Sequence, residues 1–329
     1  MTPEAVDLFA GAGGISLGLQ AAGFEIRGAV EHDGDAAATF RGLHPGTKLH
    51  EGDIAAADFS DFEGVDLVAG GPPCQPFSVG GKRLAEDDPR NGFPQFIRAV
   101  RDIRPRAFLF ENVAGAVSAT KRPYFEWMLR ELHACGYRTV WRCVNAADFG
   151  VPQRRLRVFA VGLRSDATFE FPRPSHGSDG DQEWIPAKSV LDPQHPLGTP
   201  NTAKITYARR PDLRPSPYDG HLFNGGGRPL DLERPSPTLL ASMGGNKTPW
   251  IDVLNVVPDY HATLLSGELP RSGEVPGARR LTVSEAALIQ GFPPGISFVG
   301  RQSSQYRQIG NAVPPSLARR IGEALRDQL

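Results

Sequence analysis

One cysteine of this chain stands in the sequence setting of a nucleophile. Cys74 follows Gly70-Gly71-Pro72-Pro73 at the end of a short apolar run, and the basic residues Lys82, Arg83 and Arg90 come soon after it. The two prolines restrict the backbone before the thiol, and basic neighbours favour the thiolate over the thiol. The sequence therefore predicts that Cys74 is accessible and reactive.

A carboxylate and two arginines are placed to assist that nucleophile. Glu111 ends an apolar run at Phe110-Glu111-Asn112-Val113, where partial desolvation would raise its pKa and let it donate a proton near neutral pH. A helix cap is the alternative role of such a Glu-Asn pair. Arg155 and Arg157 alternate along a predicted strand, so both would point toward Glu111 if the two strands are neighbours.

The N-terminal segment has the features of a nucleoside-binding turn. Asp7–Gly14 passes from an apolar strand into a glycine-rich turn, which allows a ligand close to the backbone. Glu31 ends the next strand 20 residues after Gly11, where a carboxylate can bind ribose hydroxyls. Because Ser16 replaces the third glycine of the dinucleotide fingerprint, an adenosyl ligand without pyrophosphate, such as S-adenosylmethionine, is favoured. NAD and a purely structural turn remain the alternatives.

Alternating strands and helices in the first half of the chain would position these groups. Such alternation implies right-handed crossovers and a doubly wound, mostly parallel sheet. Ligands bind beyond the carboxyl ends of the strands in such sheets, where the groups named above are expected. The predicted strands are 5–9, 26–31, 66–70, 107–111 and 158–162, and the predicted helices are 14–22, 35–43, 93–103 and 124–134.

The amino-acid composition changes after about Leu163. Pro, Gly and Arg become frequent, but aromatic residues persist, so residues 164–280 are predicted to form a second, smaller, loop-rich β domain rather than a linker. Strand-like runs occur at 238–241 and 250–257. Helical patterns return at 282–290 and 312–325, with Asn311 at a predicted N-cap.

Composition excludes several classes of protein. The chain has 329 residues, of which 40% are hydrophobic and 22% charged, and no run approaches the length of a membrane span or the pattern of a signal peptide. A soluble, cytoplasmic protein without a membrane partner is expected. Its three cysteines match neither a disulfide framework nor a zinc pattern, so we expect no metal.

Charge is unevenly distributed along the chain. Residues 1–80 contain 3 basic and 12 acidic side chains, whereas residues 81–157 contain 15 basic and 8 acidic ones. This segregation suits a cationic small molecule near the first segment and a polyanion near the second. The plainer interpretation is that most of these charges lie on solvated faces.

Taken together, the motifs resemble the DNA (cytosine-5) methyltransferase family of bacterial restriction–modification systems. The resemblance covers nearly the whole chain except about 164–279, which corresponds to that family's variable target-recognition region. The blocks that carry it are Phe9-Ala10-Gly11-Ala12-Gly13, Pro72-Pro73-Cys74-Gln75, Glu111-Asn112-Val113, Gln153-Arg154-Arg155-Leu156-Arg157, residues 280–293 and Gly310-Asn311-Ala312-Val313-Pro314.

The resemblance implies a fold, a reaction and a cofactor. The fold would be the Rossmann-like S-adenosylmethionine-dependent methyltransferase fold, with a catalytic domain at 1–172 plus 303–329 and a target-recognition domain at 173–302. Cys74 would attack carbon 6 of a flipped-out cytosine in a specific duplex DNA sequence. Glu111 would hold the protonated N3 edge, and Arg157, supported by Arg155, would hold the O2 side. The methyl group of S-adenosyl-L-methionine would go to carbon 5.

The same resemblance assigns binding residues and partners. Double-stranded DNA is the expected partner of a monomeric enzyme, and a cognate restriction endonuclease would act on the same site without necessarily binding the chain. The implied cofactor-binding residues are Phe9, Gly11, Gly13, Gly14, Glu31, His32, Asp53, Ile54, Pro73, Asn311 and Ala312, and the implied DNA-binding residues are Gln75, Ser78, Arg83 and Thr238.

Three rival functions are disfavoured by particular residues. A related RNA cytosine-5 methyltransferase would typically carry a Cys-Phe-Thr block, and no cysteine here precedes Phe-Thr. A catalytically silent DNA-binding module would have no reason to keep Cys74, Glu111 and Arg157 together. A NAD-dependent dehydrogenase leaves Cys74 and the incomplete glycine fingerprint unexplained.

Overall fold

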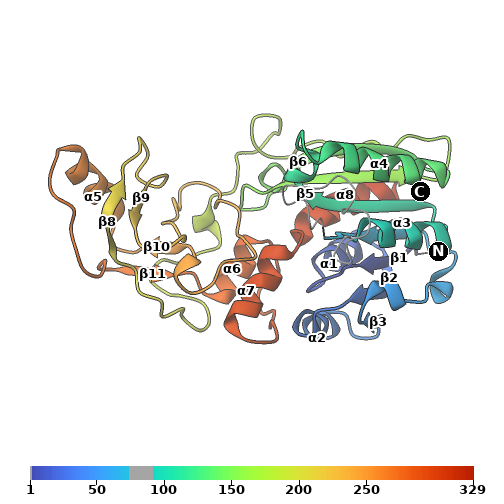
Figure 1. Ribbon diagram of the computed structural model, residues 1–329, viewed down its shortest axis with the longest axis horizontal. Coiled ribbons are helices and arrows are strands. Elements are labelled where there is room, and N and C mark those ends of the chain that lie inside the picture. The colour runs from blue at the N-terminus through green and yellow to red at the C-terminus, as the bar shows by residue number, and fades with distance from the viewer. Residues whose placement is uncertain (1, 74–91) are drawn as a thin grey trace. The chain divides into compact units, whose positions relative to one another are not determined.

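The chain forms two compact units in the computed structural model, which describes residues 2–73 and 92–329 (Figure 1). Unit 1 comprises Met1–Gly150, Arg155–Gln182 and Ala312–Leu329, and unit 2 comprises Val151–Arg154 and Glu183–Asn311. Unit 1 is therefore discontinuous in sequence, because its last helix follows the whole of the second unit.

A seven-stranded sheet forms the centre of unit 1, in the order β3-β2-β1-β4-β5-β7-β6. The first five strands in that order pair in parallel, whereas β7 runs antiparallel to both neighbours. The predicted doubly wound, mostly parallel sheet is thus confirmed. The strands are β1 (Glu4–Leu8), β2 (Glu25–Glu31), β3 (Lys48–Glu51), β4 (Leu67–Gly70), β5 (Ala107–Val113), β6 (Arg138–Asn145) and β7 (Leu156–Leu163).

Helices cover both faces of this sheet. The connections β1–α1–β2 and β4–α3–β5 extend the sheet in opposite directions, so right-handed crossovers place α1 and α3 on opposite faces. Phe93 and Phe96 of α3 pack edge-on against Phe110 of β5 in an aromatic core. The helices are α1 (Gly14–Ala21), α2 (Gly34–Leu43), α3 (Phe93–Ile103), α4 (Arg122–Ala134) and α8 (Pro315–Arg326).

Helix α8 packs directly on α1, so the end of the chain completes the layer begun at its start. A Cβ added at Gly18 of α1 would lie 2.4 Å from the Ala318 Cβ and 2.6 Å from the Pro315 carbonyl oxygen of α8. Only glycine permits this close approach of the two helices.

Unit 2 is built from two small antiparallel sheets and short helices joined by long loops. Its core contains the fully buried Leu222, Trp250 and Tyr260. The loop-rich character predicted from the sequence is present. Its elements are β8 (Tyr207–Asp212), β9 (His221–Phe223), β10 (Trp250–Asp252), β11 (Ala278–Arg280), α5 (Val256–Leu265), α6 (Val283–Ile289) and α7 (Gln302–Asn311).

Three local predictions are wrong. The strand expected at 250–257 stops at Asp252, whose two carboxylate oxygens accept hydrogen bonds from the backbone N–H groups of Val256 and Val257 and so begin α5. Residues 238–241 form no strand. Asn311 is not the N-cap of the last helix: it ends α7, and α8 begins at Pro315, because a proline lacks the N–H that the first helical turn leaves unpaired anyway.

Candidate active site

The candidate site lies where the strand order of the sheet reverses. Strands β1 and β4 are neighbours, but the chain leaves them in opposite directions, and this arrangement opens a crevice beyond their carboxyl ends. Phe9 follows β1, and Gly71 and Pro72 follow β4. The Asn112 side-chain amide donates a hydrogen bond to the Pro72 carbonyl at 2.8 Å. The segment that leads to Cys74 is therefore anchored to the end of β5.

Glu111 and Arg157 form a buried ion pair at this edge. Antiparallel pairing of β5 with β7 sets Val113 opposite Arg157, and the Arg157 Nε lies 3.0 Å from the Glu111 Oε1. Their side chains are about nine-tenths buried. Burial raises the pKa of Glu111, while the positive charges of Arg157 and Arg155 oppose that rise. The net effect is a raised pKa, which favours the protonated form that a proton donor needs.

Glycine at position 71 leaves room for this carboxyl group. A Cβ at Gly71 would lie 3.0 Å from the Glu111 Oε2, so a larger residue would displace the side chain. The segment at Gly71, which leads from β4 to Cys74, therefore lies close to the Glu111 side chain.

Arg155, directly before β7, is hydrogen-bonded to the segment that leads into α8. Its side chain is fully buried, and its Nη2 donates a hydrogen bond to the Ala312 carbonyl at 3.0 Å. Burial and the neighbouring Arg157 lower the pKa of Arg155 to about 9, so the guanidinium stays charged at neutral pH. Arg155 also interacts electrostatically with Glu111, so it lies near the Glu111–Arg157 pair.

The turn after β1 is strained and tightly held. Phe9 has a φ of 59°, a left-handed conformation that is unfavourable for a bulky side chain. The two oxygens of the buried Glu31 carboxylate accept hydrogen bonds of 2.7 Å from the Gly11 and Asp33 backbone N–H groups. Apart from Gly11 and its chain neighbours, no heavy atom of residues 2–73 and 92–329 lies within 4 Å of the position a Cβ would take at Gly11. A ligand can therefore approach the backbone of this turn.

The other candidate cofactor residues surround the same turn. Gly14 lies against the backbone of Val313 and the side chain of Ala312, so the start of α1 meets the segment after Asn311. The Asp53 carboxylate caps the 3₁₀ turn Ile54–Ala56 by accepting the Ala55 N–H at 2.9 Å. His32 is mostly exposed and lies 3.3 Å from Glu31, and Pro73 is exposed.

Sequence reasoning missed two buried polar residues beneath the turn. Asp7 is fully buried and accepts hydrogen bonds from the Ser16 N–H and hydroxyl, and burial raises its pKa to about 7. His44 is 2% exposed, and its Nε2 would lie 2.5 Å from a Cβ at Gly13. Burial lowers the pKa of His44 to about 4, so its ring is neutral. A charged residue inside the apolar run 5–9 was the only available signal.

Four candidate residues lie outside the described part of the chain. They are Cys74, Gln75, Ser78 and Arg83, and the basic residues Lys82 and Arg90 lie there too. Their proposed roles rest on the sequence and on the anchored segment Gly71–Pro72 beside them.

Thr238 belongs to a cavity of unit 2. Its hydroxyl donates a hydrogen bond to the Arg154 carbonyl at 2.7 Å. The buried Gln153 amide binds both the Leu239 N–H at 3.0 Å and the Gln290 side chain at 2.7 Å, which fixes this part of the wall. The cavity has a volume of about 710 Å³, and its lining includes the cationic residues Arg154, Arg228, Arg234 and Lys247.

Comparison with known proteins identifies the family. The sequence matches the profile of the C-5 cytosine-specific DNA methylase family over residues 4–207 and 239–327. This chain belongs to that family. The DNA (cytosine-5-)-methyltransferase expected from the motifs is thereby confirmed as its activity class.

Individual relatives cover almost all of this DNA methyltransferase. It is 32% identical to the type II methyltransferase M.NgoPII of Neisseria gonorrhoeae, over 98% of this chain and 95% of that protein. It is 35% identical to M.NaeI of Lentzea aerocolonigenes, over 99% of this chain and 75% of that protein. The crystal structure of a Spodoptera frugiperda DNMT2 variant has the same fold, with a TM-score of 0.74, 19% identity and coverage of 98% of this chain and 99% of that one. In the described ranges, no helix has the length and apolar character to span a membrane.

Proposed function

We propose that this methyltransferase transfers a methyl group from S-adenosyl-L-methionine to carbon 5 of a flipped-out cytosine in a specific short duplex DNA sequence, through a covalent bond between Cys74 and carbon 6. The observation that carries the proposal is the buried Glu111–Arg157 pair against Gly71, three residues before Cys74 in the chain. A general acid, a cation and a nucleophile-bearing segment would then face one reacting base.

Each protein group has a defined task in this reaction. Carbon 5 of cytosine is a weak nucleophile, and addition of the Cys74 thiolate to carbon 6 would make it an enamine carbon. Glu111 would supply a proton at N3 as the thiolate adds, and Arg157 would hold the O2 side and stabilise developing charge. After methyl transfer, the carbon-5 proton would pass to water and its bonding pair would re-form the double bond between carbons 5 and 6. This would expel the Cys74 thiolate, return the N3 proton to Glu111 and give 5-methylcytosine. The base must leave the helix first, because stacked neighbours block both faces of its ring.

The turn after β1 suits an adenosyl cofactor. The open space beside Gly11 and the carboxylates of Glu31 and Asp53 fit a ligand with ribose hydroxyls, an adenine amino group and a sulfonium charge. S-adenosylmethionine supplies an activated methyl group. Phe9, Glu31 and Asp53 would orient it, with His32, Ile54 and Pro73 at the edges and Gly13, Gly14, Asn311 and Ala312 along its methionine end.

Unit 2 suits the recognition of duplex DNA. Cationic side chains around its cavity would contact phosphates, and Thr238 would lie near the backbone of the flipped nucleotide. Gln75, Ser78 and Arg83 would contact the DNA close to the reacting base. The division into a catalytic domain at 1–172 plus 303–329 and a recognition domain at 173–302 is part of this proposal. We also propose that the enzyme is monomeric and acts on cytoplasmic DNA. A cognate endonuclease would cut the same site when it is unmethylated.

Trapping with 5-fluorocytosine tests the covalent mechanism. DNA that carries this base at the target should form a denaturation-resistant complex with the wild-type enzyme and cofactor, because the fluorine cannot leave as a proton does. The Cys74→Ser variant should form none, whereas Cys143→Ser, a matched control at an exposed thiol, should behave as wild type. Absence of an adduct in the wild type, or normal methylation by Cys74→Ser, would refute the mechanism.

The modified nucleic acid must also be identified. Bisulfite sequencing of DNA and RNA from a host that expresses the chain should show methylated cytosine in one DNA sequence context. Methylation confined to RNA would favour the related RNA enzyme, and no methylation at all would favour the silent binding module.

A further inference from the structure

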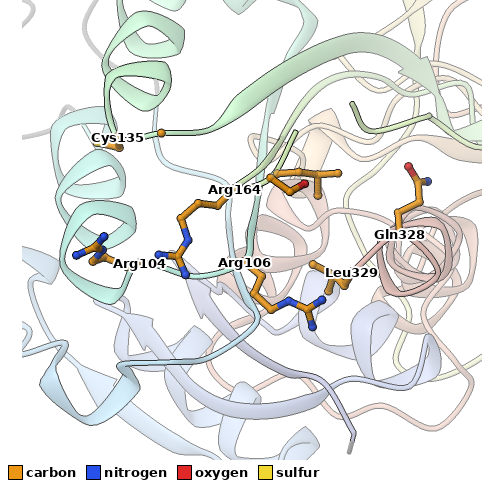
Figure 2. A pocket seen from close by; sticks show the side chains of 9 residues that line it. Arg104, Arg106, Cys135, Arg164, Gln328 and Leu329 are labelled. Atoms are coloured by element: carbon orange, nitrogen blue, oxygen red, sulfur yellow. The ribbon is translucent and has the colours of Figure 1, made fainter. Parts of the chain in front are cut away.

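An arginine-lined pocket lies beside the start of β5 and the end of β7, and Figure 2 shows the side chains that line it. It has a volume of about 440 Å³ and is lined by Arg104, Arg106 and Arg164 together with Cys135 and Leu163. The pocket lies next to the first residue of β5 and the last residue of β7, whereas the Glu111–Arg157 pair lies toward the other ends of these strands. It is therefore separate from the methylation site within unit 1.

Hydrogen bonds fix the backbone from which these arginines project. The Arg164 N–H donates to the Arg106 carbonyl at 2.8 Å, which continues the pairing of β5 with β7. The hydroxyl of the buried Tyr137 donates to the Pro105 carbonyl at 2.8 Å. Three cationic side chains thus start from a rigid frame, although the guanidinium groups themselves reach solvent.

The backbone of Arg104 is in an unfavourable conformation. This residue follows α3 as its C-cap with a φ of 52°, in the left-handed region where glycine is preferred after a helix. A side chain is kept here in spite of that preference. Strain of this kind at a non-glycine residue is a reason to look for a role of the side chain.

The charge of the pocket is incompletely neutralised. Arg106 lies 3.2 Å from the Asp66 carboxylate, but within the described ranges Arg104 and Arg164 form no salt bridge with Asp or Glu, and neither acid occurs among the described lining residues. Figure 2 shows the Arg164 side chain extending toward Arg104. The three arginines still outnumber the two carboxylates near them, that of Asp66 and the α-carboxylate of Leu329 in the lining, and this excess of positive charge favours a bound anion.

We propose that this pocket binds a compact polyphosphate anion. Guanidinium groups match phosphate oxygens with paired N–H donors, and Arg104 and Arg164 would each contact a phosphate group while Arg106 adds positive potential. The volume accommodates a diphosphate or triphosphate group. Inorganic polyphosphate and the phosphate chain of a nucleotide share this chemistry.

Calorimetry with sodium tripolyphosphate on the full chain tests the proposal. At low, matched ionic strength the wild type should bind it, and the double variant Arg104→Gln/Arg164→Gln should bind on the order of tenfold more weakly or worse. The double variant Arg101→Gln/Arg130→Gln loses the same charge at exposed helix positions outside the lining, and it should bind within about twofold of wild type. Unchanged DNA methylation would confirm that both variants are folded.

The remaining outcomes are equally decisive. Tighter binding of ATP than of tripolyphosphate would identify a nucleotide as the source of the phosphates, and equal or weaker binding would identify inorganic polyphosphate. No measurable heat up to about 5 mM tripolyphosphate would overturn the proposal, as would equal weakening in the two double variants. Displacement of tripolyphosphate by a duplex without the target sequence would instead assign the arginines to nucleic acid and would also overturn it.

Discussion

Glu111 experiences two opposed influences that suit it to proton donation. Desolvation favours its neutral form, and the guanidinium of Arg157 at 3.0 Å favours its charged form. Desolvation is the larger influence, so the pKa of Glu111 is raised. The role of Glu111 is therefore best tested by a substitution that keeps the shape of its side chain but removes its ionisable proton.

The variant Glu111→Gln should lose activity without losing the fold. Glutamine keeps the hydrogen bond to Arg157 but cannot transfer a proton to N3, so the rate of methyl transfer should fall by roughly 10²–10⁴. Single-turnover kinetics with saturating DNA and cofactor would measure the fall. Glu126→Gln, on an exposed position of α4, should leave the rate unchanged. A Glu111→Gln rate near that of wild type would remove proton donation from the mechanism.

Asp7 should make the stability of the enzyme depend on pH. Its folded-state pKa is raised from 3.8 to about 7, so the folded chain retains a proton that the unfolded chain releases above pH 4. The stabilisation is full below pH 4 and is lost as the pH rises through about 7. Asp7→Asn should remove this loss and flatten the free energy of unfolding between about pH 4 and 7, where the wild type loses on the order of 1.4 kcal/mol per pH unit.

Urea unfolding at pH 5, 6, 7 and 8 would measure this slope. The exposed Asp327→Asn should keep the slope of the wild type. An Asp7→Asn slope equal to that of the wild type would show that Asp7 does not titrate in this range.

Some features of these residues could be predicted from the sequence and others could not. Strand alternation brought Arg157 toward Glu111, because a period of two fixes which face each side chain occupies. His44 and the strained φ of Phe9 were not visible in the sequence, since both depend on how α2 and the turn after β1 meet in three dimensions.

At the scale of elements, the contact between α1 and α8 is unusually close. Gly18→Ala would place a methyl group against the backbone of Pro315, so the free energy of unfolding should fall by about 1–3 kcal/mol. Gly42→Ala is a matched control, because Gly42 lies in α2 and has open space around its Cβ position. It should stabilise the enzyme by up to about 1 kcal/mol. Thermal unfolding of both variants would measure the difference, and equal effects would show that α8 can move away from α1.

Burial explains which elements the sequence predicted. The central strands β1, β4 and β5 are almost wholly buried and appear as apolar runs. The edge strands β3 and β6 are only partly buried and are interrupted by polar residues, so their sequences lack a continuous apolar run. The helix α5 was missed because an Asp252 side chain starts it at a point that propensity does not mark.

At the scale of the whole molecule, chemistry and recognition should be separable. Exchange of residues 173–279 for the corresponding segment of a relative should move the methylated sequence and leave the chemistry unchanged. Phosphate contacts should give both proteins a similar salt dependence, while base contacts should discriminate by roughly 1–3 kcal/mol per bidentate pair. Bisulfite sequencing would read the new context. A folded, active chimera that still methylates the original sequence would place specificity elsewhere, most simply in the segment after Cys74.

The discontinuity of unit 1 has a consequence for the timing of biosynthesis. The surface of α1 that receives α8 emerges from the ribosome early, but α8 follows the roughly 130 residues of 183–311. At about 5–20 residues per second, that interval lasts roughly 6–26 s. During it the nascent sheet exposes Leu19 and its neighbours, which α8 later buries. Each newly made enzyme therefore becomes competent only after its last helix is released, and the interval before that is when a chaperone would matter most.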